Sequence, residues 1–215
     1  EVIMAKLLYS VTHKVLRPLH DDVDRYFTII DCELQSIERN NFSVVTAGRA
    51  QFFLIDVYSG LEHGYTAFDL FNQKATTLDF YQALYNETED SLSLKPYLAK
   101  AFPRLPPEAV NIIILDWISI SPNYRGKGLV GRLVEGVVDL FAGQLVGLMV
   151  LKPFPLQFKD VTDSGYWQSR AMFEQFSQDK PTVFKKLSCY YERLGFCHIG
   201  YKSNGHEGIM ARCLI

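Results

Sequence analysis

The sequence has few cysteines and no long hydrophobic run. Its four cysteines are scattered over 215 residues, and none forms a CxxC pair or a zinc-spaced cluster with histidine. This low density indicates free thiols in a reducing compartment, so we expect a cytoplasmic protein without a metal site. The longest apolar run, 145–151, is far shorter than the roughly 20 residues of a membrane-spanning helix. The first residues also lack the basic and then apolar layout of a signal peptide.

A strong excess of charge is missing as well. The formal net charge is −2, from 22 basic and 24 acidic residues, which does not favour nucleic acid as a partner. The five histidines are isolated and are interpreted as surface or structural residues. A hydrophobic content of 48% predicts a substantial core. Because no linker, repeat or low-complexity segment divides the chain, we expect one domain over 1–215.

The N-terminal hundred residues carry weak patterns. The elements predicted here are a strand at 4–9, a helix from Asp21 to Ile37, and a hairpin of strands 42–46 and 51–58 that turns near Ala47 and Gly48. Helical pieces are then predicted within 65–103, over 78–85 and 94–102, with the polar stretch 86–93 between them.

The patterns are sharper from residue 104 onward. The predicted order is strand 110–120, helix 125–141, strand 145–151, helix 182–194 and two closing strands, 196–201 and 209–214. The continuous apolar character of 145–151 is typical of a strand covered on both faces. This order predicts an α/β or α+β fold, a central sheet flanked by helices.

The segment from Ile118 to Gly131 leads from the first of these strands into the following helix. The N-terminus of a helix leaves backbone N–H groups without partners and carries the positive end of the helix dipole. Gly126 and Gly128 would allow an anion to approach that backbone closely. Each glycine lowers helix stability by up to about 1 kcal/mol relative to alanine, which favours a functional reason for both. With Arg125 and Lys127 beside them, the segment predicts a phosphate or pyrophosphate site.

The spacing from Gly126 to Gly131 also matches the dinucleotide-binding pattern GxGxxG. In that fold the strand runs almost directly into the first glycine, whereas five residues, 121–125, intervene here. The acidic residue expected about 20 positions further on is missing as well, because the next strand ends in Val150, Leu151 and Lys152. The context therefore excludes a dinucleotide site.

Two motifs resemble those of the GNAT superfamily of N-acyltransferases. The run Ile118-Ser-Ile-Ser-Pro-Asn-Tyr-Arg-Gly-Lys-Gly128 is similar to the acetyl-CoA signature, and Tyr191-Glu-Arg-Leu-Gly-Phe196 is similar to the second signature. The resemblance covers about 108–215, and the helical pieces in 65–103 look like an insertion. It implies a GNAT-like mixed central sheet flanked by helices and splayed at the acetyl-CoA site.

The resemblance also implies a function and residue roles. The chain would move an acetyl group directly from acetyl-CoA, a co-substrate, to a primary amine, without a metal. Tyr191 would protonate the departing thiolate, and Asp116 is the candidate base. The residues implied in coenzyme binding are Ile118, Ser119, Ile120, Arg125, Gly126, Lys127, Gly128, Leu129, Val130 and Gly131. The chain departs from the family pattern at Val130, where glycine or alanine is usual, and at Phe184 and Lys185, where an asparagine is often found.

Other interpretations remain open at this point. Tyr191 could be a core residue, with Tyr190 as the active tyrosine, and Asp116 could form a structural salt bridge. The chain could be a non-catalytic acyl-CoA-binding module, or it could transfer a longer acyl chain. The acceptor, a small amine or a protein amine, is not readable; we expect its walls in 157–176, in 65–103 and beside Lys152–Pro155. A homodimer is also left open.

Overall fold

A computed structural model describes residues 8–17, 22–37, 43–88, 91–142, 144–158, 177–202 and 208–215. Seven strands form one mixed sheet in the order β1-β2-β3-β6-β7-β9-β8. They are β1 Leu8–Leu16, β2 Phe27–Ile37, β3 Val44–Ile55, β6 Asn111–Ile120, β7 Val146–Leu151, β8 Cys197–Lys202 and β9 Gly208–Cys213. Within it, only β6 and β7 are parallel neighbours among the described strands.

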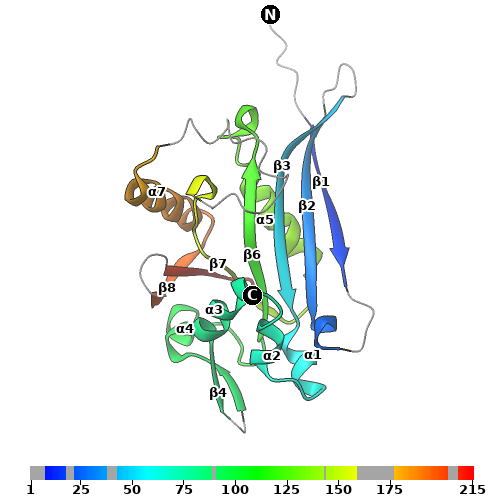
Figure 1. The fold of residues 1–215 in the computed structure, drawn as a ribbon, viewed down its shortest axis with the longest axis vertical. Coiled ribbons are helices and arrows are strands. Elements are labelled where there is room, and N and C mark those ends of the chain that lie inside the picture. The colour runs from blue at the N-terminus through cyan, green and yellow to red at the C-terminus, as the bar shows by residue number, and fades with distance from the viewer. Residues whose placement is uncertain are drawn as a thin grey trace, which may run out of the picture.

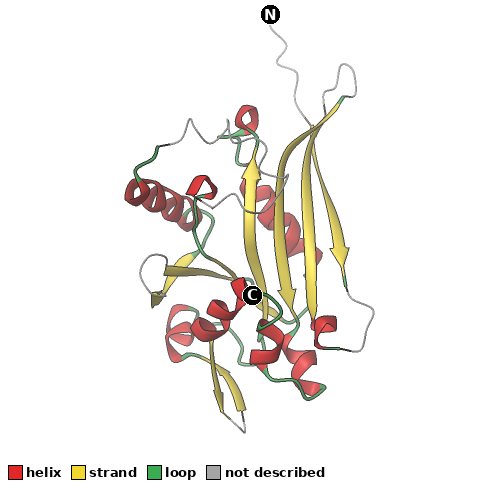
Figure 2. Cartoon of the chain, in the orientation of Figure 1, coloured by secondary structure: helices red, strands yellow, loops and turns green. Residues whose placement is uncertain are grey.

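Helices cover both faces of this sheet (Figures 1 and 2). The helices are α1 Val57–Glu62, α2 Ala67–Phe71, α3 Ala75–Leu84, α4 Pro96–Ala101, α5 Leu129–Leu140 and α7 Lys180–Glu192. A two-stranded hairpin, β4 Tyr85–Thr88 and β5 Ser91–Leu94, joins α3 to α4. The predicted mixed sheet flanked by helices is confirmed. No helix in the described ranges is long and apolar enough to cross a membrane.

The core has two layers, one on each face of the sheet. On one face, α5 and α7 pack against the strands through residues such as Leu133, Val137 and Tyr191. On the other face, the short helices α1 to α4 bury Leu70, Phe71 and other side chains. Since β6 and β7 contribute to both layers, their residues are apolar almost throughout, as the continuous run at 145–151 predicted.

The elements predicted from residue 104 onward are confirmed, with small shifts at their ends. Strand 110–120 is β6, strand 145–151 is β7, and the closing strands are β8 and β9. Helix 182–194 is α7, which begins two residues earlier. Helix 125–141 is α5, which begins at Leu129 because Arg125 to Gly128 form the loop before it.

The prediction of a helix from Asp21 to Ile37 is wrong. Only a short 3-10 turn, η1 Val23–Tyr26, precedes strand β2, and Asp21 lies outside the described residues. Every second side chain of β2 is buried from Ile30 to Ser36, which is the period of a strand. Residues four apart, such as Ile30 and Leu34, share a face in a helix and in a strand alike. This ambiguity explains the error.

The predicted hairpin with a turn at Ala47 and Gly48 is wrong as well. These residues lie inside the continuous strand β3, at a register shift against β2. A Cβ atom on Gly48 would lie 2.5 Å from Cδ1 of Ile120 and 2.9 Å from the carbonyl oxygen of Ser119. The glycine therefore serves the close approach of β6 and not a turn. Of the predicted strand 4–9, residues 4–7 lie outside the described ranges, and Tyr9 belongs to β1.

The helical pieces predicted within 65–103 correspond to α2, α3 and α4. The hairpin β4–β5 occupies the polar stretch 86–93 that was predicted as a separator. Helix α1 was not predicted. All of these elements lie between β3 and β6 in the chain, although β3 and β6 are neighbours in the sheet.

Strand β6 loses its second neighbour halfway along its length. It pairs with β7 only as far as Leu115, whereas its pairing with β3 continues to Ile120. Asp116 lies at a bulge, because Leu115 and Trp117 pair with consecutive residues of β3. The bulge resets the alternation of side chains, so Ile118 packs in the same layer as Leu115. The sheet is therefore splayed at 116–120, as predicted.

Candidate functional site

A cavity of about 840 Å³ opens where β6 and β7 separate. Its walls come from the C-terminal end of β6, helix α3, the segment after β7 and helix α7. Of the residues predicted as functional, the cavity is lined by Asp116, Ile118, Ser119, Ile120, Arg125, Val130 and Tyr191. Parts of the chain far apart in sequence, α3 and α7 among them, therefore meet at one place.

The glycine-rich loop has the backbone geometry of an anion-binding turn. Gly126 and Gly128 have φ angles of 74° and 70°, a conformation that side chains rarely adopt. A Cβ atom at either position would meet no atom within 4 Å, so the loop faces open space. Gly128 is the N-cap of α5, and no described side chain caps the helix there. The first-turn N–H groups of α5 are thus available to a ligand.

Two cations flank this loop. The Nε of Arg125 donates a hydrogen bond to the carbonyl oxygen of Ile120 at 3.0 Å, which closes the turn between β6 and α5. Burial lowers the pKa of the Arg125 guanidinium, which nevertheless stays charged in proteins. The Nζ of Lys127 lies 5.1 Å from the centroid of the Tyr124 ring. Positive charge is therefore held beside the open N–H groups.

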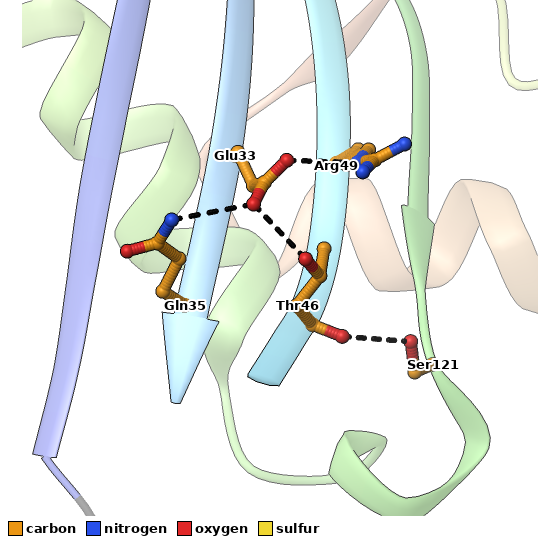
Figure 3. Close-up of polar contacts among 5 residues, drawn as sticks. All are labelled: Glu33, Gln35, Thr46, Arg49 and Ser121. Carbon is orange, nitrogen blue, oxygen red and sulfur yellow. Dashed lines mark hydrogen bonds and ion pairs between the residues drawn. The ribbon is translucent and has the colours of Figure 1, made fainter. Parts of the chain in front are cut away.

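A network of polar side chains links strands β2 and β3 next to this loop (Figure 3). The Glu33 carboxylate accepts hydrogen bonds from Thr46 Oγ1 at 2.9 Å, from Arg49 Nε at 3.0 Å and from Gln35 Nε2 at 3.3 Å. Ser121, the first residue after β6, donates to the carbonyl oxygen of Thr46 at 3.4 Å. The start of the loop is thereby tied to β3. No sequence pattern indicated this network, because its members are spread over three segments.

Replacing Gly128 with alanine is expected to weaken anion binding at the loop about tenfold, because a left-handed conformation disfavours a side chain by about 1–2 kcal/mol. Isothermal titration with pyrophosphate would measure this change. Gly136→Ala is the matched control, since Gly136 lies in the middle of α5, away from the loop, and its added Cβ would meet His13 Nε2 at an ordinary distance of 3.5 Å. Equal affinity in the two variants would contradict an anion-binding role of the loop.

Tyr191 lies at the base of the cavity, near the C-terminal end of α7. Its side chain is buried, with 6% exposed, and its ring packs edge-on against Tyr190 and Phe196 at centroid distances of 5.9 Å and 5.8 Å. Burial, and then the nearby Tyr190, raise the pKa of Tyr191 well above its ordinary value. The hydroxyl is therefore held protonated. Tyr190 also lines the cavity, and burial raises its pKa too.

These pKa shifts predict a loss of stability at alkaline pH. A tyrosine whose pKa is raised in the folded state stabilises that state below the unfolded pKa of about 10 and loses this contribution above it. Tyr85 has the same property, because its buried hydroxyl donates to the Val110 carbonyl at 2.6 Å and burial raises its pKa. The free energy of unfolding should fall as pH rises above about 10, as measured by urea titration. A smaller fall is expected in Tyr191→Phe, and an unchanged one would contradict the burial argument.

Asp116 reaches the cavity because of its bulge. In a regular strand its side chain would alternate with those of Leu115 and Trp117, but the bulge re-aims it at the point where β7 ends. The side chain is half-buried and lines the cavity, as does Trp117. Asp116 and Tyr191 thus line the same cavity.

The cavity is also lined by charged residues outside the predicted catalytic and coenzyme-binding set, in segments expected to form the acceptor walls. Asp79 of α3 forms an ion pair with Lys152, the residue after β7. The Nζ of Lys152 also lies 5.7 Å from the centroid of the Phe80 ring. Residues 73 positions apart therefore meet at the wall contributed by the predicted insertion. The other expected wall, 157–176, lies outside the described residues from 159 onward.

Some residues of the predicted coenzyme-binding set do not line the cavity. The Leu129 side chain is buried in the core under α5, with 2% exposed, so only its backbone is available to a ligand. Gly126, Lys127, Gly128 and Gly131 belong to the loop and first turn, outside the cavity lining. Within the described ranges, no three His, Cys, Asp or Glu side chains gather as a metal site.

Comparison with known proteins shows only distant similarity. No protein-family model matches the chain, and no curated protein sequence does. Arylalkylamine N-acetyltransferase 2 from Aedes aegypti has a TM-score of 0.34 and 16% identity, with 85% of this chain and 73% of that chain covered. A structure described as a bacterial toxin has a TM-score of 0.38 and 10% identity, with coverage of 96% and 92%. SsHAT has a TM-score of 0.34 and 15% identity, with coverage of 85% and 72%. Such distant likenesses assign no activity.

Proposed function

We propose that this chain is an acetyltransferase that moves an acetyl group from acetyl-CoA to a primary amine, within a single domain. One observation carries the proposal. The end of β6 (118–120), Arg125 and Val130 on either side of the α5 N-terminus, and Tyr191 of α7 all line one cavity. Such a cavity fits a ligand with a polyphosphate at one end, an amide-bearing arm in the middle and a reactive thioester beside the tyrosine.

Each part of the coenzyme has a chemical counterpart in the chain. The first-turn N–H groups of α5, with Arg125 and Lys127, suit the pyrophosphate. The pairing of β6 with β7 ends at Leu115, and the backbone of 118–120 has no described strand partner on that side, so it can pair with the amides of the pantetheine arm as a strand would. These backbone groups at the end of β6 match the hydrogen-bonding amides of the pantetheine arm.

The transfer step needs an acid and an acceptor amine with a free lone pair. The amine nitrogen attacks the thioester carbonyl carbon, and the carbon–sulfur bond breaks. The Tyr191 hydroxyl gives its proton to the departing sulfur, a step favoured by its position in the cavity. Asp116, directly or through water, accepts the proton that the amine loses. A general acid and a general base each typically contribute about 10²–10⁴-fold to the rate.

The test is thiol release with acetyl-CoA and a panel of primary amines. Release that depends on the amine, with the acetylated amine found by mass spectrometry, supports the proposal. Tight binding of acetyl-CoA without thiol release would instead favour a non-catalytic acyl-CoA-binding module. Parallel assays with longer acyl-CoA donors would separate acetyl transfer from transfer of a longer chain.

A further inference from the structure

The end of the cavity away from the glycine loop carries a nearly balanced set of charges. Asp79 and Lys152 form an ion pair there, and the Asp116 carboxylate lies on the adjoining strand. The other cations lining the cavity, Arg125 and Lys186, come from the loop before α5 and from α7. Asp79 and Lys152 neutralise each other, so this pair adds no net charge to the cavity.

Most of the other side chains at this end are apolar, and Thr76 and Gln157 add uncharged polar groups. Phe80, Phe154, Pro155 and Leu156 line it from α3 and from the segment after β7. Phe154 packs edge-on against Phe184 of α7, with their ring centroids 5.8 Å apart. Apart from Asp79 and Lys152, these walls offer little to a second charged group on an acceptor.

We propose that the acceptor is a primary monoamine on an uncharged, apolar or aromatic body, and that the Asp79–Lys152 pair sets this preference. The inference rests on the proposed acetyl transfer. The apolar and aromatic walls hold the body of the amine. Because Lys152 neutralises Asp79, Asp79 does not attract a second ammonium group on the acceptor. Because Asp79 neutralises Lys152, Lys152 does not attract a carboxylate on the acceptor.

Three acceptors with the same six-carbon chain test this preference: hexylamine, hexamethylenediamine and aminocaproate. Their far ends are neutral, cationic and anionic, and kcat/KM is measured for each by thiol release. In the native protein, kcat/KM for hexylamine should exceed that for either other acceptor by about tenfold. This is the size expected when a charged group on the acceptor lies next to an ion pair that is already neutral.

Single variants should redirect the preference in opposite directions. Lys152→Met leaves the Asp79 carboxylate without this cation, so the ratio for hexamethylenediamine over hexylamine should rise about tenfold. Asp79→Asn releases the Lys152 ammonium, so the ratio for aminocaproate should rise instead. The double variant Asp79→Asn with Lys152→Met removes both charges and should restore the preference for hexylamine. Circular dichroism melts check that each variant is folded.

The outcomes separate this inference from the proposed function. Thiol release with a preference for a charged far end in the native protein would overturn the inference alone. The inference would also be overturned if the kcat/KM ratios among the three acceptors were identical in the native protein and in the folded variants. Asp79→Asn is one of these variants, and its position on α3 is half-exposed. Absence of thiol release with every amine would overturn both the inference and the proposed function.

Discussion

Replacing Tyr191 with phenylalanine is expected to lower kcat for acetyl transfer by about 10²–10³-fold, the range typical of a lost general acid. Phenylalanine keeps the ring, and with it the edge-on packing against Tyr190 and Phe196. Only the proton donor is removed from the cavity. Steady-state kinetics with acetyl-CoA and hexylamine would measure kcat, and isothermal titration should show an unchanged affinity for acetyl-CoA.

Tyr190→Phe is the matched comparison for this experiment. Tyr190 lies next in the chain, lines the same cavity and is less buried than Tyr191. We expect a change of less than about fivefold in kcat for this variant, since it removes a hydroxyl that is not assigned to the departing sulfur. If Tyr190→Phe gave the large loss and Tyr191→Phe the small one, the two roles would have to be exchanged. Equal, small losses would remove the tyrosine acid from the mechanism.

Replacing Gly147 with alanine is expected to lower the free energy of unfolding by about 3 kcal/mol or more. Overpacking of a core usually costs about 1–3 kcal/mol, and here the nearest atom belongs to the backbone, which cannot move aside as a side chain can. Gly147 lies in β7, an inner strand of the sheet between β6 and β9. Its added Cβ would lie 2.1 Å from the Ala109 carbonyl oxygen and 2.8 Å from Leu105 Cδ1. Urea unfolding followed by circular dichroism would measure the loss.

Gly136→Ala provides the control for Gly147→Ala. Gly136 lies in the middle of α5, and its added Cβ would meet His13 Nε2 at an ordinary contact distance of 3.5 Å. Alanine is the better helix former by about 1 kcal/mol, so this variant should be slightly more stable than the native protein. A native-like stability of Gly147→Ala would mean that β6 and β7 lie further from residues 105–109 than in this structure.

The C-terminal half could be predicted well because its patterns are unambiguous. The apolar run at 145–151 can only be a covered strand, and the glycines at 126 and 128 interrupt the helical pattern where the loop ends. In the N-terminal half, β2 and β3 were misread for physical reasons. Ile30 and Leu34 share a face in either structure, and Gly48 reports the close approach of a distant strand, which no local pattern reveals.

The candidate site could be predicted only where its residues are close in sequence. The loop 118–131 and Tyr191 belong to local motifs, and the cavity contains residues from both. The bulge that aims Asp116 depends on pairing with β3, and the Asp79–Lys152 pair depends on a contact between an inserted helix and the end of β7. Both are consequences of tertiary structure, so the sequence offered no periodicity from which to infer them.

The position of helices α1 to α4 in the chain has a consequence for how specificity can change. They form one excursion between β3 and β6, two strands that pair with each other directly. The excursion supplies Asp79 and Phe80 to the cavity, whereas the glycine loop and Tyr191 come from later segments. Exchanging or remodelling residues 57–102 could therefore alter the accepted amine while the coenzyme machinery stays intact. Under the proposed function, residues 57–102 would share the choice of amine with the segment after β7, whereas the glycine loop and Tyr191 would serve the acyl donor.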